Sequence, residues 1–221
     1  VIHNNSEIGN YKTDSAERRI KDLNPHCIVK TFTERINRQN VLEILKQFDI
    51  VCDCSDNFGT RYLINDACII LNKPLIYGSV QGFEGQVSVF NLKKNSPNFR
   101  DLLPKPPEQG FIPSCADNGV IGISPGIIGI LQANEIIKIV IKKGKVLDGK
   151  ILVYNLLENS IKKLNLSVSK QSPKINNLIK NTKDYESEIH FENIKTISPI
   201  RFKKIYQTNL NEIIIFDVRE K

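Results

Sequence analysis

Several features common in other proteins are missing from this sequence of 221 residues. It has no methionine, it begins at Val1, and no uninterrupted apolar run reaches the roughly 18 residues that a membrane-spanning helix needs. The start also lacks the charged, apolar and small-residue pattern of a secretory signal peptide, so neither a membrane span nor secretion is indicated. Because a complete product begins with methionine, we expect the chain to be a piece of a longer protein, and a lost leader stays open.

Cysteine pairs spaced as C-x-x-C are also absent. The cysteines are odd in number: Cys27, Cys52, Cys54, Cys68 and Cys115. This usage argues against a disulfide framework and against a zinc site built from cysteines, and it indicates a reducing compartment. All of them except Cys115 lie in apolar patterns, where a thiol usually packs in a core.

The composition gives little support for a nucleic-acid ligand. The formal net charge is +7, but the lysines are scattered, and no basic stripe alternates with aromatic residues as a nucleic-acid face requires. We therefore expect no nucleic-acid partner, whereas acidic proteins and phosphate-bearing ligands remain compatible with the charge. The apolar and charged fractions, 40% and 25%, are ordinary for a folded protein with a core.

What the chain does contain is a regular alternation of helix and strand patterns. Residues 11–24 predict a helix that ends near Asn24, because proline disfavours helical geometry in the residue before it. There follow a strand at 27–36, a helix at 37–48, a buried strand at 49–54 and a helix at 60–72. This alternation predicts an α/β fold with a Rossmann-like, mostly parallel sheet.

The next part of the chain predicts an antiparallel extension of that sheet. Two strands lie within 74–92 and two more at 150–156 and 161–166, and between them a helix is capped by Ser124 and stopped by Gly144. The first domain then covers residues 1–166. The polar residues 167–195 predict a linker, and residues 196–221 predict a helix and a buried strand that open a second, truncated domain.

Acidic and amide side chains follow the strand at 49–54, in the stretch DCSDNFG. Ligands of open α/β sheets bind at the carboxyl ends of the strands, so Asp56 can hold Mg²⁺ beside a triphosphate. Either Asp56 or Asn57 can instead cap the following helix, and on residue type alone the cap is favoured. The two roles are compatible on neighbouring residues.

Two further residues stand out by their position. Lys12 lies at the start of the first predicted helix, where the helix dipole disfavours a cation unless an anion binds nearby; otherwise it is a solvated side chain. Cys115 lies in the turn-rich stretch PSCADNG, and a thiol near a helix entrance can become a thiolate nucleophile, although no histidine adjoins it.

The order of several motifs resembles one family. The stretches IGNYKTDSA, DCSDNFGTRYLINDAC, KPLIYGSVQGFEGQVSVFN, PSCADNGV and GIIGILQANEIIKI are similar to successive blocks of the ThiF/MoeB-type adenylyltransferases that activate ubiquitin-like sulfur carriers. The resemblance covers residues 1–166 and implies the ThiF-type fold. It also implies that ATP and Mg²⁺ serve to adenylate the carboxyl-terminal glycine of a carrier, above all the small subunit of molybdopterin synthase in molybdenum cofactor biosynthesis.

The resemblance implies roles for four residues. Lys12, Asp56 and Asn57 are expected to bind the nucleotide, with Asp56 as the Mg²⁺ ligand. Cys115 matches a loop cysteine that is proposed to take part in thioester or persulfide chemistry.

Many relatives also hold a structural zinc ion between two C-x-x-C pairs. Here Asn98 and Asp101 stand where the first pair would be, and the later stretch SPKINNL has no cysteine. We therefore expect no zinc and a loop held by packing and prolines, as in cyanobacterial and plastid members. Plastid stroma or bacterial cytoplasm is the expected location.

The ends of the chain lead to further expectations. The family's Gly-rich phosphate loop precedes Val1, so this chain alone is expected to be inactive, whereas the full-length protein would adenylate its carrier. Residues 196–221 resemble the opening of a rhodanese-like sulfurtransferase domain. From the family alone, a homodimer and a sulfur donor such as a cysteine desulfurase are expected.

Three alternatives stay open. The same chemistry could serve a carrier for thiamine synthesis or tRNA thiolation. A non-catalytic subunit could bind a ubiquitin-like partner. A nicotinamide-dependent oxidoreductase would need G-x-G-x-x-G before Val1 and would not explain PSCADNG.

Overall fold

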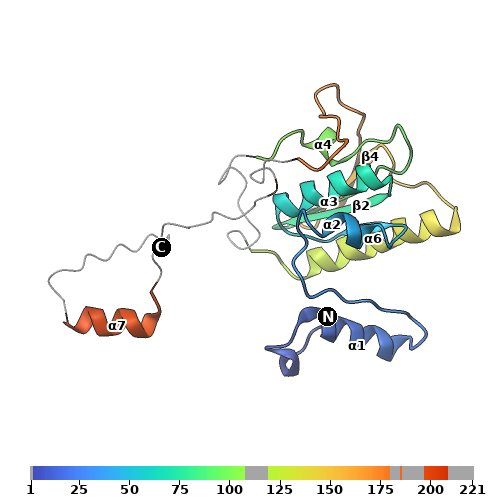
Figure 1. Cartoon of the computed structure of the whole chain (residues 1–221). Coiled ribbons are helices and arrows are strands. Elements are labelled where there is room, and N and C mark those ends of the chain that lie inside the picture. Colours follow the sequence, from blue (N-terminus) through green and yellow to red (C-terminus); the bar gives the residue numbers. More distant parts are fainter. Residues whose placement is uncertain (1, 108–118, 180–184, 186–196, 209–221) are drawn as a thin grey trace. The chain divides into compact units, whose positions relative to one another are not determined.

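Figure 1 shows a computed structural model of the chain, in which residues 2–107, 119–179, 185 and 197–208 are described. The chain divides into two compact units, Val1–Ser187 and Glu188–Lys221, and each is taken by itself. In the second unit the helix α7, Pro199–Thr208, confirms the helix that its sequence predicts. The strand predicted after α7 lies outside the described residues.

A five-stranded sheet forms the centre of the first unit, with neighbouring strands in the order β1-β2-β3-β4-β5. The strands are β1 (Val51–Asp53), β2 (Leu75–Gln81), β3 (Glu84–Phe90), β4 (Lys150–Asn155) and β5 (Ser160–Asn165). β1 and β2 run parallel, whereas β2 to β5 pair antiparallel. The mixed α/β fold with an antiparallel extension is therefore confirmed. Among the described strands, however, only β1 and β2 pair in parallel, so this part of the sheet is mostly antiparallel and not mostly parallel as predicted.

Helices cover both faces of this sheet (Figure 1). One face carries α2 (Val41–Leu45), α3 (Phe58–Leu71) and α4 (Phe99–Leu102), and α6 (Ile123–Ile141) packs on β2 and β3 from the other. Side chains of a strand alternate between its faces, so β2 places Leu75 and Tyr77 in the first core and Ile76 in the second. β2 thus contributes side chains to both cores.

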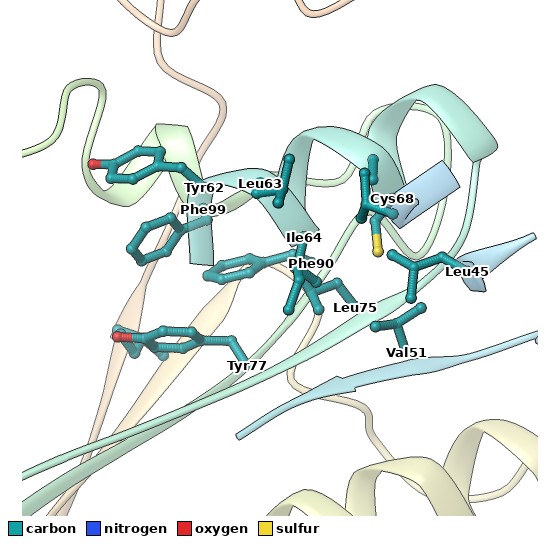
Figure 2. Close-up of a cluster of buried hydrophobic side chains, with 13 residues drawn as sticks. Leu45, Val51, Tyr62, Leu63, Ile64, Cys68, Leu75, Tyr77, Phe90 and Phe99 are labelled. Carbon is teal, nitrogen blue, oxygen red and sulfur yellow. The ribbon is translucent and has the colours of Figure 1, made fainter. Parts of the chain in front are cut away.

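Aromatic rings hold α3 and α4 on β2, as Figure 2 shows. The ring centroid of Phe99 lies 5.0 Å from that of Tyr62 and 5.3 Å from that of Tyr77, and Phe90 lies 5.4 Å from Tyr77. At these separations aromatic pairs add to the free energy gained by burial. The cluster fixes the start of α3 relative to β2, where the candidate site lies.

The first predicted strand is wrong. α1 (Lys12–Leu23) ends before Asn24 as predicted, but residues 27–36 have no regular structure and Ile28 is fully exposed. A strand is stable only when a neighbour accepts and donates its backbone hydrogen bonds. None of the described strands lies beside residues 27–36, so the apolar alternation there has no partner.

The start of α6 also differs from the prediction. Its N-cap is Gly122, and the buried Ser124 lies in the first turn, where its Oγ donates to the carbonyl oxygen of Gly82 at 3.2 Å. Ser124 therefore ties the helix to the turn between β2 and β3 and does not cap it. The helix ends at Ile141, and Lys142 adopts the left-handed conformation with φ 54°.

By length and composition, α6 is the helix of the described ranges that could cross a membrane. Length and composition alone are weak evidence for a membrane span, because helices in protein cores meet the same criterion. Ile128 of α6 is 3% exposed and belongs to the second core with Ile76 of β2 and Val87 of β3.

Residues beyond β5 contact α3 and α4 within the first unit. The backbone nitrogen of Ser169 donates to Asp101 Oδ1 at 2.8 Å, and the hydroxyl of Tyr185 donates to Asp66 Oδ2 at 2.6 Å. Leu178 and Tyr185 also pack against the first core. Part of the segment predicted as a linker is therefore tied to α3 and α4.

Candidate functional site

The candidate site lies where β1 ends and α3 begins. Asp53, the last residue of β1, is 2% exposed, and burial raises the pKa of its carboxyl group. Its Oδ1 accepts a hydrogen bond from the backbone nitrogen of Ser55 at 2.8 Å. The buried carboxylate of Asp53 therefore holds the backbone of the loop after β1. This loop places the next polar residues at the carboxyl end of a parallel strand.

Asp56 and Asn57 have different positions in this loop. Asn57 is the N-cap of α3, because its Oδ1 accepts from the backbone nitrogen of Thr60 at 2.8 Å. Its Nδ2 donates to Asp56 Oδ1 at 3.4 Å. Asp56 is exposed. The cap predicted for Asn57 is therefore confirmed, and Asp56 presents an open carboxylate.

This loop offers a Mg²⁺–nucleotide one exposed carboxylate, that of Asp56. Mg²⁺ is usually bound by one or two carboxylates together with substrate phosphates and water. Asp56 can supply one carboxylate, whereas Asp53 is turned inward to Ser55. In the described ranges no group of three or more histidine, cysteine, aspartate and glutamate side chains could hold a metal ion.

Arg61, in the first turns of α3, is a residue that sequence reasoning missed. Its Nη2 and Nε both donate to the carbonyl oxygen of Ser55, at 2.8 and 3.2 Å, and its Nη1 donates to Ser79 Oγ of β2 at 2.8 Å. The side chain is 7% exposed, and its guanidinium lies 5.4 Å from the ring centroid of Tyr77. A cation near a helix start is disfavoured by the dipole, and this signal, applied to Lys12, could have identified Arg61 too.

Gln132 of α6 reaches the same loop from the opposite face of the sheet. Its Nε2 donates to the carbonyl oxygen of Asp53 at 2.8 Å, and the residue is 3% exposed. Gly78 of β2 makes this approach possible, because a Cβ there would lie 2.4 Å from Cδ of Gln132. The glycine leaves the space that the glutamine amide fills.

Cys52 and Cys54, on either side of Asp53, are exposed, with their Sγ atoms 3.9 Å apart. The hydrogen bond between the thiols raises the pKa of Cys52 and lowers the pKa of Cys54 to about 7. Cys27 is exposed as well, and Cys68 is buried. The prediction that these four cysteines pack in a core is therefore right for Cys68 and wrong for the others.

We expect Cys54 to react with iodoacetamide around neutral pH. Only the thiolate is a nucleophile, so its alkylation rate should reach half its maximum near pH 7, whereas Cys52 should react far more slowly. Peptide mass spectrometry after timed alkylation measures both rates. In Cys52→Ala the thiol that lowers the pKa of Cys54 is gone, so the midpoint should move up towards its ordinary value. An unchanged midpoint would contradict this assignment.

Of the other two predicted site residues, Lys12 lies in the described part of the chain and Cys115 does not. Lys12 is the exposed first residue of α1, and the structure gives no interaction between its side chain and Asp56. Cys115 lies outside the described residues. Of the predicted nucleotide-binding residues, the described part of the chain therefore brings together Asp56 and Asn57.

Hydrogen bonds organise the loop that contains Asn98 and Asp101. Asn98 caps α4 by accepting from the backbone nitrogen of Arg100 at 2.9 Å, and Asp101 Oδ2 accepts from the backbone nitrogen of Asn98 at 2.8 Å. The Asn98 side chain also accepts from the backbone nitrogen of Asp101, so Asn98 and Asp101 form a capping box. Since Asp101 also accepts from Ser169, polar contacts hold the loop in addition to the packing that its sequence predicts.

The same polar cluster contains a buried ion pair. Arg100 is 2% exposed and Asp66 is 0% exposed, and Arg100 Nε and Nη2 each donate to a different oxygen of Asp66 at 2.7 Å. Tyr185 adds its hydroxyl to one of those oxygens. The cluster joins α3, α4 and the chain beyond β5.

Comparisons with known proteins agree with this fold. The ThiF family profile matches residues 1–176. A "Sulfur carrier protein adenylyltransferase" of Thermus thermophilus is 41% identical over 177 residues, which are 78% of this chain and 65% of that protein. A "Probable molybdopterin-synthase adenylyltransferase" of Pyropia yezoensis is 38% identical over 224 residues, 99% of this chain and 57% of that protein. The chain thus spans between half and two thirds of these relatives.

A solved structure supports the architecture. The crystal structure of E. coli MccB with ATP has a TM-score of 0.65 at 18% identity, and the match covers 76% of this chain and 52% of that chain. At this identity the likeness concerns the arrangement of helices and strands alone.

Proposed function

Since the chain belongs to the ThiF family, we propose that it is part of an enzyme that uses ATP and Mg²⁺ to adenylate the carboxyl-terminal glycine of a ubiquitin-like sulfur carrier. One observation carries the proposal: an exposed carboxylate, that of Asp56, lies at the carboxyl end of a parallel strand beside a capped helix start. The name of the Pyropia yezoensis relative favours the molybdopterin-synthase small subunit over thiamine or tRNA-thiolation carriers. Both named relatives favour an adenylyltransferase over an oxidoreductase.

The proposed reaction joins the carrier's carboxylate to the α-phosphate of ATP and releases pyrophosphate. Bound Mg²⁺ would offset the negative charge on that leaving group. Asp56 would hold the metal ion, Asn57 would keep the start of α3 in place beside it, and Lys12 would bind phosphate oxygens. Together these side chains would bind and orient the nucleotide before the carboxylate attacks.

Later steps extend the same proposal. The thiolate of Cys115 would displace AMP from the acyl-adenylate to form a thioester, or carry sulfur as a persulfide supplied by a donor such as a cysteine desulfurase. Residues 167–195 would link the adenylyltransferase domain, 1–166, to a rhodanese-like domain that begins within 196–221. We propose a homodimer without zinc, in the plastid stroma or the bacterial cytoplasm.

Carrier-dependent pyrophosphate exchange tests the function. The complete protein is incubated with ATP, Mg²⁺, labelled pyrophosphate and a ubiquitin-like sulfur carrier, and label in ATP is measured. We expect exchange with the intact carrier and none with a carrier that lacks its last glycine, because the glycine carboxylate is the group that attacks. Equal exchange with the intact and the shortened carrier would overturn the proposal. So would a lack of exchange with each of the molybdopterin, thiamine and tRNA-thiolation carriers.

A further inference from the structure

The carboxylate of Asp56 has little side-chain support of its own. It is exposed, and it accepts a hydrogen bond of 3.4 Å from Asn57 Nδ2. A ligand that is poorly held loses affinity for its metal, because the metal must then order it. The position of this carboxylate is therefore set mainly by the backbone of the loop between β1 and α3.

Arg61 restrains that backbone directly before Asp56. The carbonyl of Ser55 belongs to the peptide group that ends at the nitrogen of Asp56, and it accepts two hydrogen bonds from the Arg61 guanidinium, at 2.8 and 3.2 Å. A guanidinium keeps its charge throughout the accessible pH range, so both are charge-assisted hydrogen bonds. They fix the plane of the peptide that orients Asp56.

The guanidinium is itself anchored to the sheet. Its Nη1 donates to Ser79 Oγ at 2.8 Å and lies 3.4 Å from the hydroxyl of Tyr77, and both residues belong to β2. Phe58 and Tyr77 lie beside it, with ring centroids 6.0 and 5.4 Å from Arg61 Cζ. The loop is thus connected through one buried side chain to the strand parallel to β1.

We propose that Arg61 is a positioning residue, which holds the Ser55–Asp56 peptide against β2 so that the carboxylate of Asp56 meets the Mg²⁺–nucleotide in a fixed place. The inference rests on the proposed function, in which Asp56 holds the metal ion. In this role Arg61 acts through the peptide before Asp56, to which it donates its hydrogen bonds.

Nucleotide affinity with and without Mg²⁺ separates this role from a structural one. Calorimetry on the complete protein measures the Kd of ATP in excess Mg²⁺ and again in EDTA, for the wild type, Arg61→Met, Arg61→Lys and the exposed control Arg201→Met. We expect Arg61→Met to weaken binding about tenfold with Mg²⁺, and less than twofold in EDTA, because the lost hydrogen bonds support the metal ligand. Arg61→Lys replaces the planar guanidinium by a single ammonium group. Its ATP affinity in Mg²⁺ should therefore lie between those of the wild type and Arg61→Met.

Each outcome decides something different. Equal losses with Mg²⁺ and in EDTA, or no loss in either, would overturn the positioning role. A wild type that binds no ATP even with Mg²⁺ would instead contradict the proposed function. If Arg61→Met does not fold, Ser79→Ala decides the question. It removes the shorter of the two hydrogen bonds from Arg61 to β2 and should weaken Mg²⁺-dependent binding a few-fold, while binding in EDTA stays the same.

Discussion

Replacing Asp66 with asparagine is expected to lower the free energy of unfolding of the first unit by about 3–5 kcal/mol. Both oxygens of Asp66 bind Arg100 at 2.7 Å, and the hydroxyl of Tyr185 lies 2.6 Å from one of them. Burial by itself would lower the pKa of Arg100, but the hydrogen bonds and the charge of Asp66 raise it overall. The substitution leaves the arginine charged, buried and without its counter-charge.

Urea unfolding followed by circular dichroism measures this loss. Tyr185→Phe is the matched control, because it removes one hydrogen bond to the same carboxylate and leaves the ion pair, and it should cost about 1.5–3 kcal/mol. The double variant Asp66→Asn, Arg100→Met should cost less than the sum of the two single changes, since no unpaired charge remains. A loss below about 1 kcal/mol for Asp66→Asn would show that the pair contributes little.

Replacing Asp56 with asparagine is expected to reduce pyrophosphate exchange by the complete protein about a hundredfold or more, because the proposed metal ligand loses its charge. Asp56 is exposed and the residue that caps α3 is Asn57, so stability should change by less than about 0.5 kcal/mol. The kcat/KM of exchange and its dependence on Mg²⁺ measure the effect.

Asp49→Asn provides the control for this change. Asp49 is also exposed, and its replacement by asparagine changes the charge by the same amount. It precedes β1, however, and so lies at the opposite end of the strand from the candidate site. It should exchange pyrophosphate like the wild type. Normal exchange by Asp56→Asn would mean that another residue holds the metal ion, whereas equal losses in both variants would point to net charge as the cause.

The sequence predicted correctly the helix ends that depend on residues next to them in the chain. The end of α1 follows from Asn24 and the proline after it, and the start of α3 follows from the side chain of Asn57. The two strands predicted within 74–92 and the two predicted at 150–156 and 161–166 correspond to β2 to β5, the antiparallel part of the sheet. The helix ends and the pairs β2–β3 and β4–β5 are made by residues that are close together in the chain, whereas α6 separates β3 from β4 in the sequence.

Predictions failed where the partner is far away in the sequence. Residues 27–36 have a strand pattern but no described strand beside them, and Ser124 bonds to a carbonyl 42 residues earlier and not to its own helix. Arg100 and Asp66 are 34 residues apart, and Tyr185 is 119 from Asp66. Nothing in a single sequence says which buried charges meet, so this cluster and the anchoring of Arg61 could only be found in three dimensions.

The close approach at Gly78 limits how this sequence can vary. A methyl group at that position would lie 2.4 Å from Gln132, which could move away only by giving up its hydrogen bond to the carbonyl oxygen of Asp53. A larger residue at 78 is therefore tolerated only together with a shorter one at 132. Among natural relatives the two positions should change together, although one lies in a strand and the other in a helix on the far side of 53 intervening residues.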